Sequence, residues 1–306
     1  SNLRFKSERV IRIENIFASF MSTSYLHKRK IKIGFSPCPN DTFIFDALVH
    51  NKINQVDFKY EPIIEDVEVL NQMAVNGKLD VSKLSVHAYG HAAAHYSILN
   101  SGAAIGHNCG PLLISKSSFS KNEMADKICA IPGQYTSALL LLKIFFPEIV
   151  KTKQMLFSKI EQALEDHICD LGLIIHESRF TFMERGFIPI ADLGKLWYAD
   201  TGLPLPLGII AAHKRIDKKD QLRINDHIHR SIQLAYQNEN PINDYIRSHA
   251  QSLSDKVIHQ HIELYVNEFS LDLGPVGKSA IRFLLSRGAQ QGLFKLPSHS
   301  IFTDEI

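Results

Sequence analysis

The chain has 306 residues, of which 45% are hydrophobic and 22% are charged, so it is long enough for two domains and is neither collagen-like nor of low complexity. Its formal net charge of +2 is too balanced to indicate a nucleic acid as a partner. No stretch approaches the ~18 consecutive apolar residues of a membrane-spanning helix. The 15 histidines are unusually many, and they invite a metal-binding or an acid–base interpretation.

The first 30 residues contain seven Lys or Arg and two Glu. This excess of positive charge predicts a basic arm, residues 1–29, outside the fold. This arm lacks the apolar segment of ~7–15 residues and the small-residue cleavage site of a secretory signal. Met21 is also compatible with a later start of translation. The four cysteines, Cys38, Cys109, Cys129 and Cys169, form no C-x-x-C pair, so we expect reduced thiols in a cytoplasmic protein.

Strands alternate with helices in the first part of the chain, which predicts an α/β fold with a largely parallel sheet. KIKIGF (30–35) is a strand, and the helix at 42–50 would have Asn40 or Asp41 as its N-cap. The next predicted elements are a strand at 56–62, a helix at 66–76, a strand at 79–85, a helix at 86–96 and a strand at 110–115.

A second α/β set follows a polar stretch at 116–127, with strands at 127–131, 154–158 and 170–175 and helices at 136–146 and 159–167. The strand predicted at 203–212 returns to the first set, and the pattern from residue 219 onward is almost wholly helical. We therefore predict a bilobal chain, in which residues 116–207 are inserted into a first lobe of residues 30–115 and 208–306. A small-molecule ligand would bind between the lobes, at the carboxyl ends of the strands.

Three histidines, His87, His91 and His95, are spaced four residues apart and would share one helix face. Two histidines at this spacing can bind a metal, as in H-E-x-x-H, but Ala88 stands where the general-base Glu would be. No carboxylate on that predicted helix completes a site. We therefore predict no metal-binding residues and interpret the triplet as surface or packing side chains.

Two strand-to-helix turns carry polar residues that could face a ligand. In SPCPNDT (36–42), two prolines hold the chain so that Asn40, Asp41 and Thr42 either cap the helix or contact a ligand. In PGQYTS (132–137), Thr136 and Ser137 either bind an anion or hydroxyl beside free backbone N–H groups, or only cap the helix. We do not expect Cys38 to be a nucleophile, since nothing in the sequence supplies a paired base.

A solitary histidine, His176, directly follows the apolar strand of LGLIIHESR (171–179). It would stand at the carboxyl end of that strand, where cleft residues gather in α/β folds. Because histidine titrates near neutral pH, this position suits a general base, although a histidine standing alone is more often structural.

Six stretches, in order, resemble the 1,4-dihydroxy-6-naphthoate synthase family of the futalosine route to menaquinone. They are SPCPNDTFIFDALVH (36–50), DVEVLNQMAVNGKLDVSKLSVHAY (66–89), SGAAIGHNCGPLLIS (101–115), PGQYTSALLLL (132–142), LGLIIHESRFTF (171–182) and LWYADTGLPLPLGIIAAHK (196–214). The resemblance implies a bilobal fold like that of type II periplasmic binding proteins. It also implies that cyclic dehypoxanthinylfutalosine is split into 1,4-dihydroxy-6-naphthoate and dihydroxyacetone.

The resemblance further implies the roles of individual residues. His176 would accept a proton, and the substrate-binding segments match Lys83, Leu84, Ser85, Thr136 and Ser137. To these we add Asn40, Asp41 and Thr42 from their position alone. Because the aromatic product supplies the driving force, we expect neither a metal nor a redox cofactor.

Three alternatives stay open. They are a non-catalytic solute-binding protein of the same fold, a related chorismate dehydratase, and a zinc hydrolase built on His87, His91 and His95. The sequence also leaves open whether the chain forms a homodimer.

Overall fold

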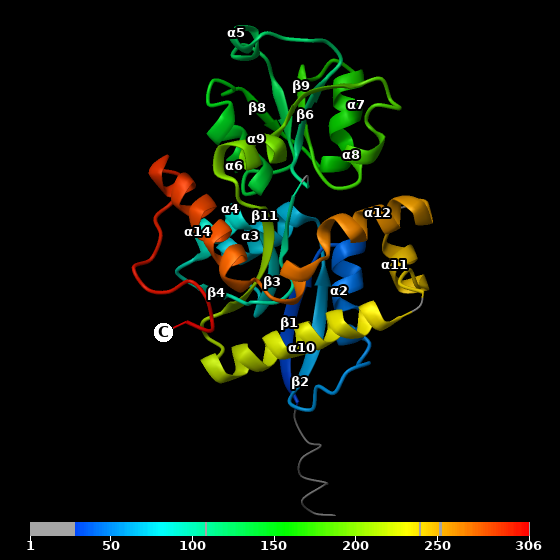
Figure 1. The fold of residues 1–306 in the computed structure, drawn as a ribbon, viewed down its shortest axis with the longest axis vertical. Helices are drawn as coiled ribbons and strands as arrows, with labels where there is room; N and C mark the ends of the chain where they lie inside the picture. The colour runs from blue at the N-terminus through cyan, green and yellow to red at the C-terminus, as the bar shows by residue number, and fades with distance from the viewer. Residues whose placement is uncertain (1–27, 108, 239, 251–252, 306) are drawn as a thin grey trace, which may run out of the picture.

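The computed structural model describes residues 28–107, 109–238, 240–250 and 253–305. It has two lobes, each built around its own β-sheet, with the described N-terminal end and the long C-terminal helices at the first (Figure 1). The predicted basic arm of residues 1–29 lies outside the described residues except for Lys28 and Arg29. Arg29 already belongs to the first strand.

The first sheet combines strands from both ends of the described chain. Its order is β2 (Phe58–Ile64), β1 (Arg29–Phe35), β3 (Val81–Ser85), β11 (Leu205–His213) and β4 (Tyr96–Ile98), and β5 (Ala104–Gly106) also pairs with β11. β1 runs parallel to β2 and β3, while β11 runs antiparallel to β3, β4 and β5. The helices α2 (Pro39–Val49), α3 (Val67–Val75) and α4 (Val86–Ala92) connect these strands.

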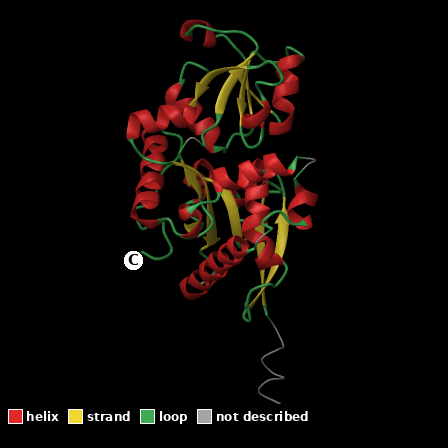
Figure 2. Cartoon of the chain, turned by 45° about the vertical axis from the view of Figure 1, so that its right-hand side comes forward, coloured by secondary structure: helices red, strands yellow, loops and turns green. Residues whose placement is uncertain are grey.

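The second sheet has the order β10 (Ile188–Asp192), β6 (Leu112–Ser115), β9 (Leu171–Ile174), β7 (Cys129–Ile131) and β8 (Thr152–Gln154). β7 is parallel to β8 and β9, and β6 is antiparallel to β9 and β10. The helices of this lobe are α5 (Lys121–Met124), α6 (Ser137–Phe145), η1 (Phe157–Lys159), α7 (Ile160–Glu165), α8 (Ser178–Thr181) and α9 (Leu193–Thr201). Figure 2 shows the two sheets one above the other.

The structure corrects two details of the predicted organisation. The sheets are mixed rather than largely parallel, because the strands that carry the chain between lobes run against their neighbours. The chain also crosses earlier than the predicted boundaries at residues 115 and 207. Strand β6 belongs to the second sheet and the start of β11 to the first. The sequence did not predict this, because a buried apolar run does not reveal which sheet it joins.

The C-terminal third is helical, as predicted, with α10 (Lys218–Gln237), α11 (Asp244–His249), α12 (Asp255–Tyr265), α13 (Glu268–Leu271) and α14 (Gly274–Gln290). α10 packs on α2 through Ile224, Ile228 and Ile232, which are spaced four apart and fully buried. Each such side chain contributes about 1.5–3 kcal/mol to folding. α14 packs against α4 of the first lobe and α6 of the second. None of the helices described here has the length and apolar character needed to span a membrane.

Candidate active site

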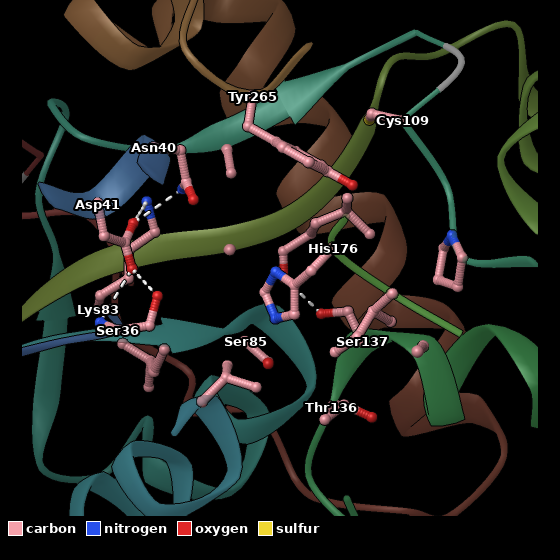
Figure 3. Close-up of a pocket in the computed structure, with 18 residues that line it drawn as sticks. Ser36, Asn40, Asp41, Lys83, Ser85, Cys109, Thr136, Ser137, His176 and Tyr265 are labelled. Atoms are coloured by element: carbon pink, nitrogen blue, oxygen red, sulfur yellow. Dashed lines mark hydrogen bonds and ion pairs between the residues drawn. The ribbon is translucent and has the colours of Figure 1, made fainter. Parts of the chain in front are cut away.

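A cavity of about 670 Å³, including its open mouth, lies where the two lobes meet (Figure 3). Its polar lining comprises Ser36, Asn40, Asp41, Lys83, Ser85, Thr136, Ser137, His176 and Tyr265. Its apolar lining includes Val67, Leu84, Ala104, Cys109, Pro111, Ala138, Ile175 and Leu207. Apolar walls combined with convergent polar groups favour a small organic ligand.

One side of the cavity is formed by the first turn of α2, which holds a buried ion pair. Asp41 Oδ1 lies 3.1 Å from Lys83 Nζ, and both side chains are less than 8% exposed. The Oδ2 atom of Asp41 accepts hydrogen bonds from the backbone N–H and the hydroxyl of Ser36, and Oδ1 accepts one from Asn40. Lys83 also donates to the carbonyl of Gly102. These contacts neutralise the lysine charge within the site.

Thr42 is not part of the cavity, which corrects its prediction as a substrate-binding residue. It is fully buried inside α2, where its hydroxyl donates to the carbonyls of Cys38 and Pro39. The helix begins at Pro39 with Cys38 as its N-cap, so neither Asn40 nor Asp41 has the predicted capping role. Successive residues of a helix point in different directions, so Asn40 and Asp41 face the cavity while Thr42 faces the packed interior.

The carboxyl end of β3 presents Lys83, Leu84 and Ser85 to the cavity, as expected for an α/β cleft. Asn71 holds Ser85 on two sides, because its amide nitrogen donates to the Ser85 hydroxyl and its oxygen accepts from the Ser85 backbone N–H. The hydroxyl therefore serves as an acceptor toward Asn71 and keeps its own hydrogen for a ligand.

On the opposite side, Thr136 and Ser137 begin helix α6. The Thr136 hydroxyl accepts from the Leu139 N–H and donates to the Gly133 carbonyl, which is ordinary capping. The Ser137 hydroxyl donates to the Leu207 carbonyl of β11 over 2.6 Å, and so joins the two lobes. What this turn offers a ligand is its backbone N–H groups at Ser137 and Ala138, which have no partner within the helix.

Glu68 of α3 reaches across to this same turn. Its carboxylate accepts from the backbone N–H of Gln134 at 3.0 Å and of Tyr135 at 3.1 Å. Burial is the largest influence on this carboxyl and raises its pKa, while the Tyr135 N–H opposes the rise. A Cβ on Gly133 would lie 2.2 Å from the carboxylate, so only glycine allows this approach. The contact fixes the loop before α6 against the first lobe.

His176 follows β9 with φ of +57°, in the left-handed region that residues other than glycine rarely adopt. Its ring packs edge-on against Phe157 at 4.9 Å and stacks on His261 at 6.0 Å. Its Nδ1 lies 3.6 Å from Cys38 Sγ, and its buried Nε2 has no hydrogen-bond partner among the described residues. Strained backbone at a cavity wall is typical of a functional residue.

The structure gives Cys38 the neighbouring base that the sequence did not reveal, since the nitrogen of His176 comes from a segment 138 residues away. Burial raises the pKa of the Cys38 thiol well above its usual value, and the charge of Glu177 raises it further. Because the thiolate and not the thiol is the nucleophile, this environment disfavours Cys38 as a nucleophile.

The histidine triplet is not a single helix face. α4 ends at Ala92, so His95 lies beyond it and stacks on His213 instead. His87 is buried and its Nδ1 lies 3.1 Å from the Thr136 carbonyl, while His91 packs between Tyr135 and Phe294. Burial lowers the pKa of His87 to about 3, with a smaller contribution from His91. His87 therefore packs in the interior, and His91 is half-buried against two aromatic rings.

Every residue predicted to touch the substrate, except Thr42, lines this cavity. The sequence did not reveal Ser36, Cys109 or Tyr265. Ser36 adjoins a predicted segment and could have been included on that ground. Tyr265 comes from α12, in the helical third, where its spacing looks like ordinary core.

The fold and the interlobe cavity together define a bilobal protein of the periplasmic-binding-protein type. A crystal structure of a protein from Archaeoglobus fulgidus is similar, with a TM-score of 0.82, 32% identity, and coverage of 88% of this chain and 100% of that one. The periplasmic aliphatic sulphonate binding protein of Escherichia coli has a TM-score of 0.60 at 11% identity, covering 88% of this chain and 89% of that one, and shows the fold alone.

Residues 31–290 match the family described as menaquinone biosynthesis, and the chain belongs to it. A relative from Thermus thermophilus, named 1,4-dihydroxy-6-naphthoate synthase, is 40% identical over 263 residues, covering 86% of this chain and 95% of the relative. A relative of the same name from Streptomyces coelicolor is 36% identical over 268 residues, covering 86% and 94%. The predicted family and bilobal fold are thus confirmed, and the chain is an enzyme of menaquinone biosynthesis.

Proposed function

We propose that this enzyme is a carbon–carbon lyase that splits cyclic dehypoxanthinylfutalosine into 1,4-dihydroxy-6-naphthoate and dihydroxyacetone. The names of both relatives support this product. The observation that carries the proposal is His176, whose ring lines the interlobe cavity and whose Nε2 has no partner in the described structure. A neutral imidazole nitrogen without a partner is ready to accept a proton.

In the proposed mechanism, His176 removes a proton from the substrate and the electrons move to break the carbon–carbon bond. The ring that remains becomes aromatic, and this supplies the driving force. A hydrogen bond between Nδ1 and the Cys38 sulphur would hold the imidazole tautomer that leaves Nε2 free. Donors at the cavity wall stabilise the oxyanion that develops as the bond breaks.

The rest of the cavity would hold the substrate. Its apolar walls suit the aromatic ring system, and the Ser85 hydroxyl has a hydrogen available for a substrate oxygen. The backbone N–H groups of Ser137 and Ala138 suit the carboxylate, since the N-terminus of α6 carries partial positive charge. Asn40 and the Asp41–Lys83 pair would bind hydroxyl groups of the three-carbon fragment.

Two further parts of the proposal concern the whole protein. The lobes would act as two domains that enclose the substrate, with the Ser137–Leu207 and Glu68–Tyr135 contacts at their junction. The reaction would take place in the cytoplasm, which is supported by four cysteines that are all free and buried.

The test is incubation of the purified protein with cyclic dehypoxanthinylfutalosine, with release of the naphthoate followed by mass. His176→Ala is expected to lower turnover by about 10²–10⁴-fold, the usual contribution of a general base, while the substrate still binds. His95→Ala is the matched control, because His95 is exposed and outside the cavity, and it should react at the parent rate. Near-parent turnover of His176→Ala would refute the mechanism, and recovery of unchanged substrate from the parent protein would favour the solute-binding alternative.

A further inference from the structure

Three potential metal ligands from distant segments converge behind the cavity. They are Cys38 at the start of α2, His176 after β9 and His261 of α12, and one ligand atom from each lies within 4.8 Å of the other two. Cys38 and His261 are buried, while His176 also lines the main cavity. Cys38 also lines a second, smaller cavity, together with Phe157 and Glu177.

His261 is the unexplained member of this cluster. It is completely buried, yet neither of its ring nitrogens has a hydrogen-bond partner in the described structure. Its ring lies parallel to that of His176, with an interplanar angle of 19°, and against the ring of Tyr265. Buried polar atoms are almost always paired, so two unpaired nitrogens on one interior side chain call for a ligand. The proposed reaction gives His261 no task.

The chemistry and spacing of the three groups suit zinc. One sulphur and two imidazole nitrogens are a common zinc ligand set. Tetrahedral bonds of about 2.3 Å to sulphur and about 2.0 Å to nitrogen place those two atoms about 3.5 Å apart. The Cys38 Sγ to His176 Nδ1 distance is 3.6 Å, so this pair already has the spacing of two zinc ligands. The His261 nitrogen lies within 4.8 Å of both atoms, so moving it closer to them would complete a three-ligand site with an open fourth position.

We propose that Cys38, His176 and His261 form a regulatory site for Zn²⁺. The ion replaces the thiol proton of Cys38, which passes to solvent, and accepts lone pairs from the two imidazoles. With Nδ1 of His176 bound to the metal, the proton that Nδ1 carries in the metal-free enzyme moves to Nε2, which then cannot act as a base. The site also ties α2 of the first lobe to the strand end of the second. Binding is independent of the proposed function, whereas the inhibition rests on it.

Binding is tested without substrate, by titrating the metal-stripped full chain with Co²⁺ and then with Zn²⁺. One equivalent of Co²⁺ should bind with a thiolate-to-cobalt charge-transfer band, and Zn²⁺ should displace it. Cys38→Ser should abolish the band and weaken Zn²⁺ binding by more than the roughly 100-fold that loss of an outer-shell partner can cost. Cys169→Ser is the matched control, because Cys169 is also buried and belongs to no such ligand cluster among the described residues. Absence of a thiolate band in the parent chain, or its persistence in Cys38→Ser, would overturn the proposal.

A second variant, His261→Gln, tests whether the loss of binding in Cys38→Ser comes from misfolding, because it removes another ligand from a different helix. It should keep the parent secondary structure and lose Zn²⁺ affinity by a similar factor. Turnover of the parent and of Cys38→Ser is then measured with a chelator and with micromolar Zn²⁺. The rate of each protein with Zn²⁺ is divided by its own rate in the chelator. The parent should be inhibited reversibly and Cys38→Ser should not, and equal inhibition of both would refute the regulatory role. Inactivity in the chelator would refute the proposed function and leave the binding result standing.

Discussion

The buried ion pair between Asp41 and Lys83 leads to the sharpest stability prediction, through Asp41→Asn. Asp41 Oδ1 accepts from Lys83 and Asn40, and Oδ2 accepts twice from Ser36. Asparagine has a single acceptor oxygen, so its NH₂ group must face two of these donors. Lys83 would also keep a charge at 7% side-chain exposure with no carboxylate beside it. Removing one partner of a buried ion pair costs about 3–5 kcal/mol, and we expect the free energy of unfolding to fall by an amount in that range.

The assay is denaturation by urea, with the midpoint and slope fitted for each variant. Lys30→Met is the matched control, because the Lys30–Glu61 pair has 69% and 35% side-chain exposure and its loss should leave the midpoint unchanged. Adding Lys83→Met to Asp41→Asn removes the orphan charge and should restore part of the lost stability. A loss below about 1 kcal/mol for Asp41→Asn, or no recovery in the double variant, would contradict the reasoning.

Two smaller predictions concern stability near α6. Burial lowers the pKa of folded His87 to about 3, whereas the unfolded side chain takes up a proton below about pH 6.5. The unfolded state therefore binds more protons between these two pH values. The free energy of unfolding should fall as the pH drops from 6.5 toward 3, by up to about 1.4 kcal/mol per pH unit. His87→Gln should therefore lose less stability between pH 7 and pH 5 than the parent in urea denaturation, and equal losses would disprove the assignment. Thr136→Ala removes the cap bonded to Leu139 and should cost about 1 kcal/mol at neutral pH, whereas an unchanged midpoint would show that the cap contributes nothing.

Local pattern was sufficient for most of the elements. The 3.6-residue spacing of Ile224, Ile228 and Ile232 predicts α10, and the polar residue Asp66 before an apolar run predicts the start of α3, where it accepts from the Glu68 N–H. Such signals act within a few residues. They failed at residues 93–96, where the predicted helix stops at Ala92 and Tyr96 begins β4 instead. Pairing with β11 decides that strand, and no local pattern contains it.

The candidate site was partly readable for a related reason. His176, Ser85 and Ser137 stand at ends of strands or starts of helices, where the topology of an α/β fold gathers ligand-binding groups. Thr42 lies at the same helix start, but its side chain is buried and its hydroxyl donates to the Cys38 carbonyl. Position near a turn was therefore not enough to show whether a residue lines the cavity.

The sequence by itself determined the bilobal α/β architecture, the family and the histidine at the end of β9, because periodicity, turn residues and long motifs are local properties. It could not determine which of the 15 histidines would meet. His87, expected on a surface or in packing, is buried beside Thr136, whereas His176 faces His261 and Cys38 across 85 and 138 residues of chain. Only the tertiary structure decided these neighbours, since contacts between distant segments depend on how both lobes pack.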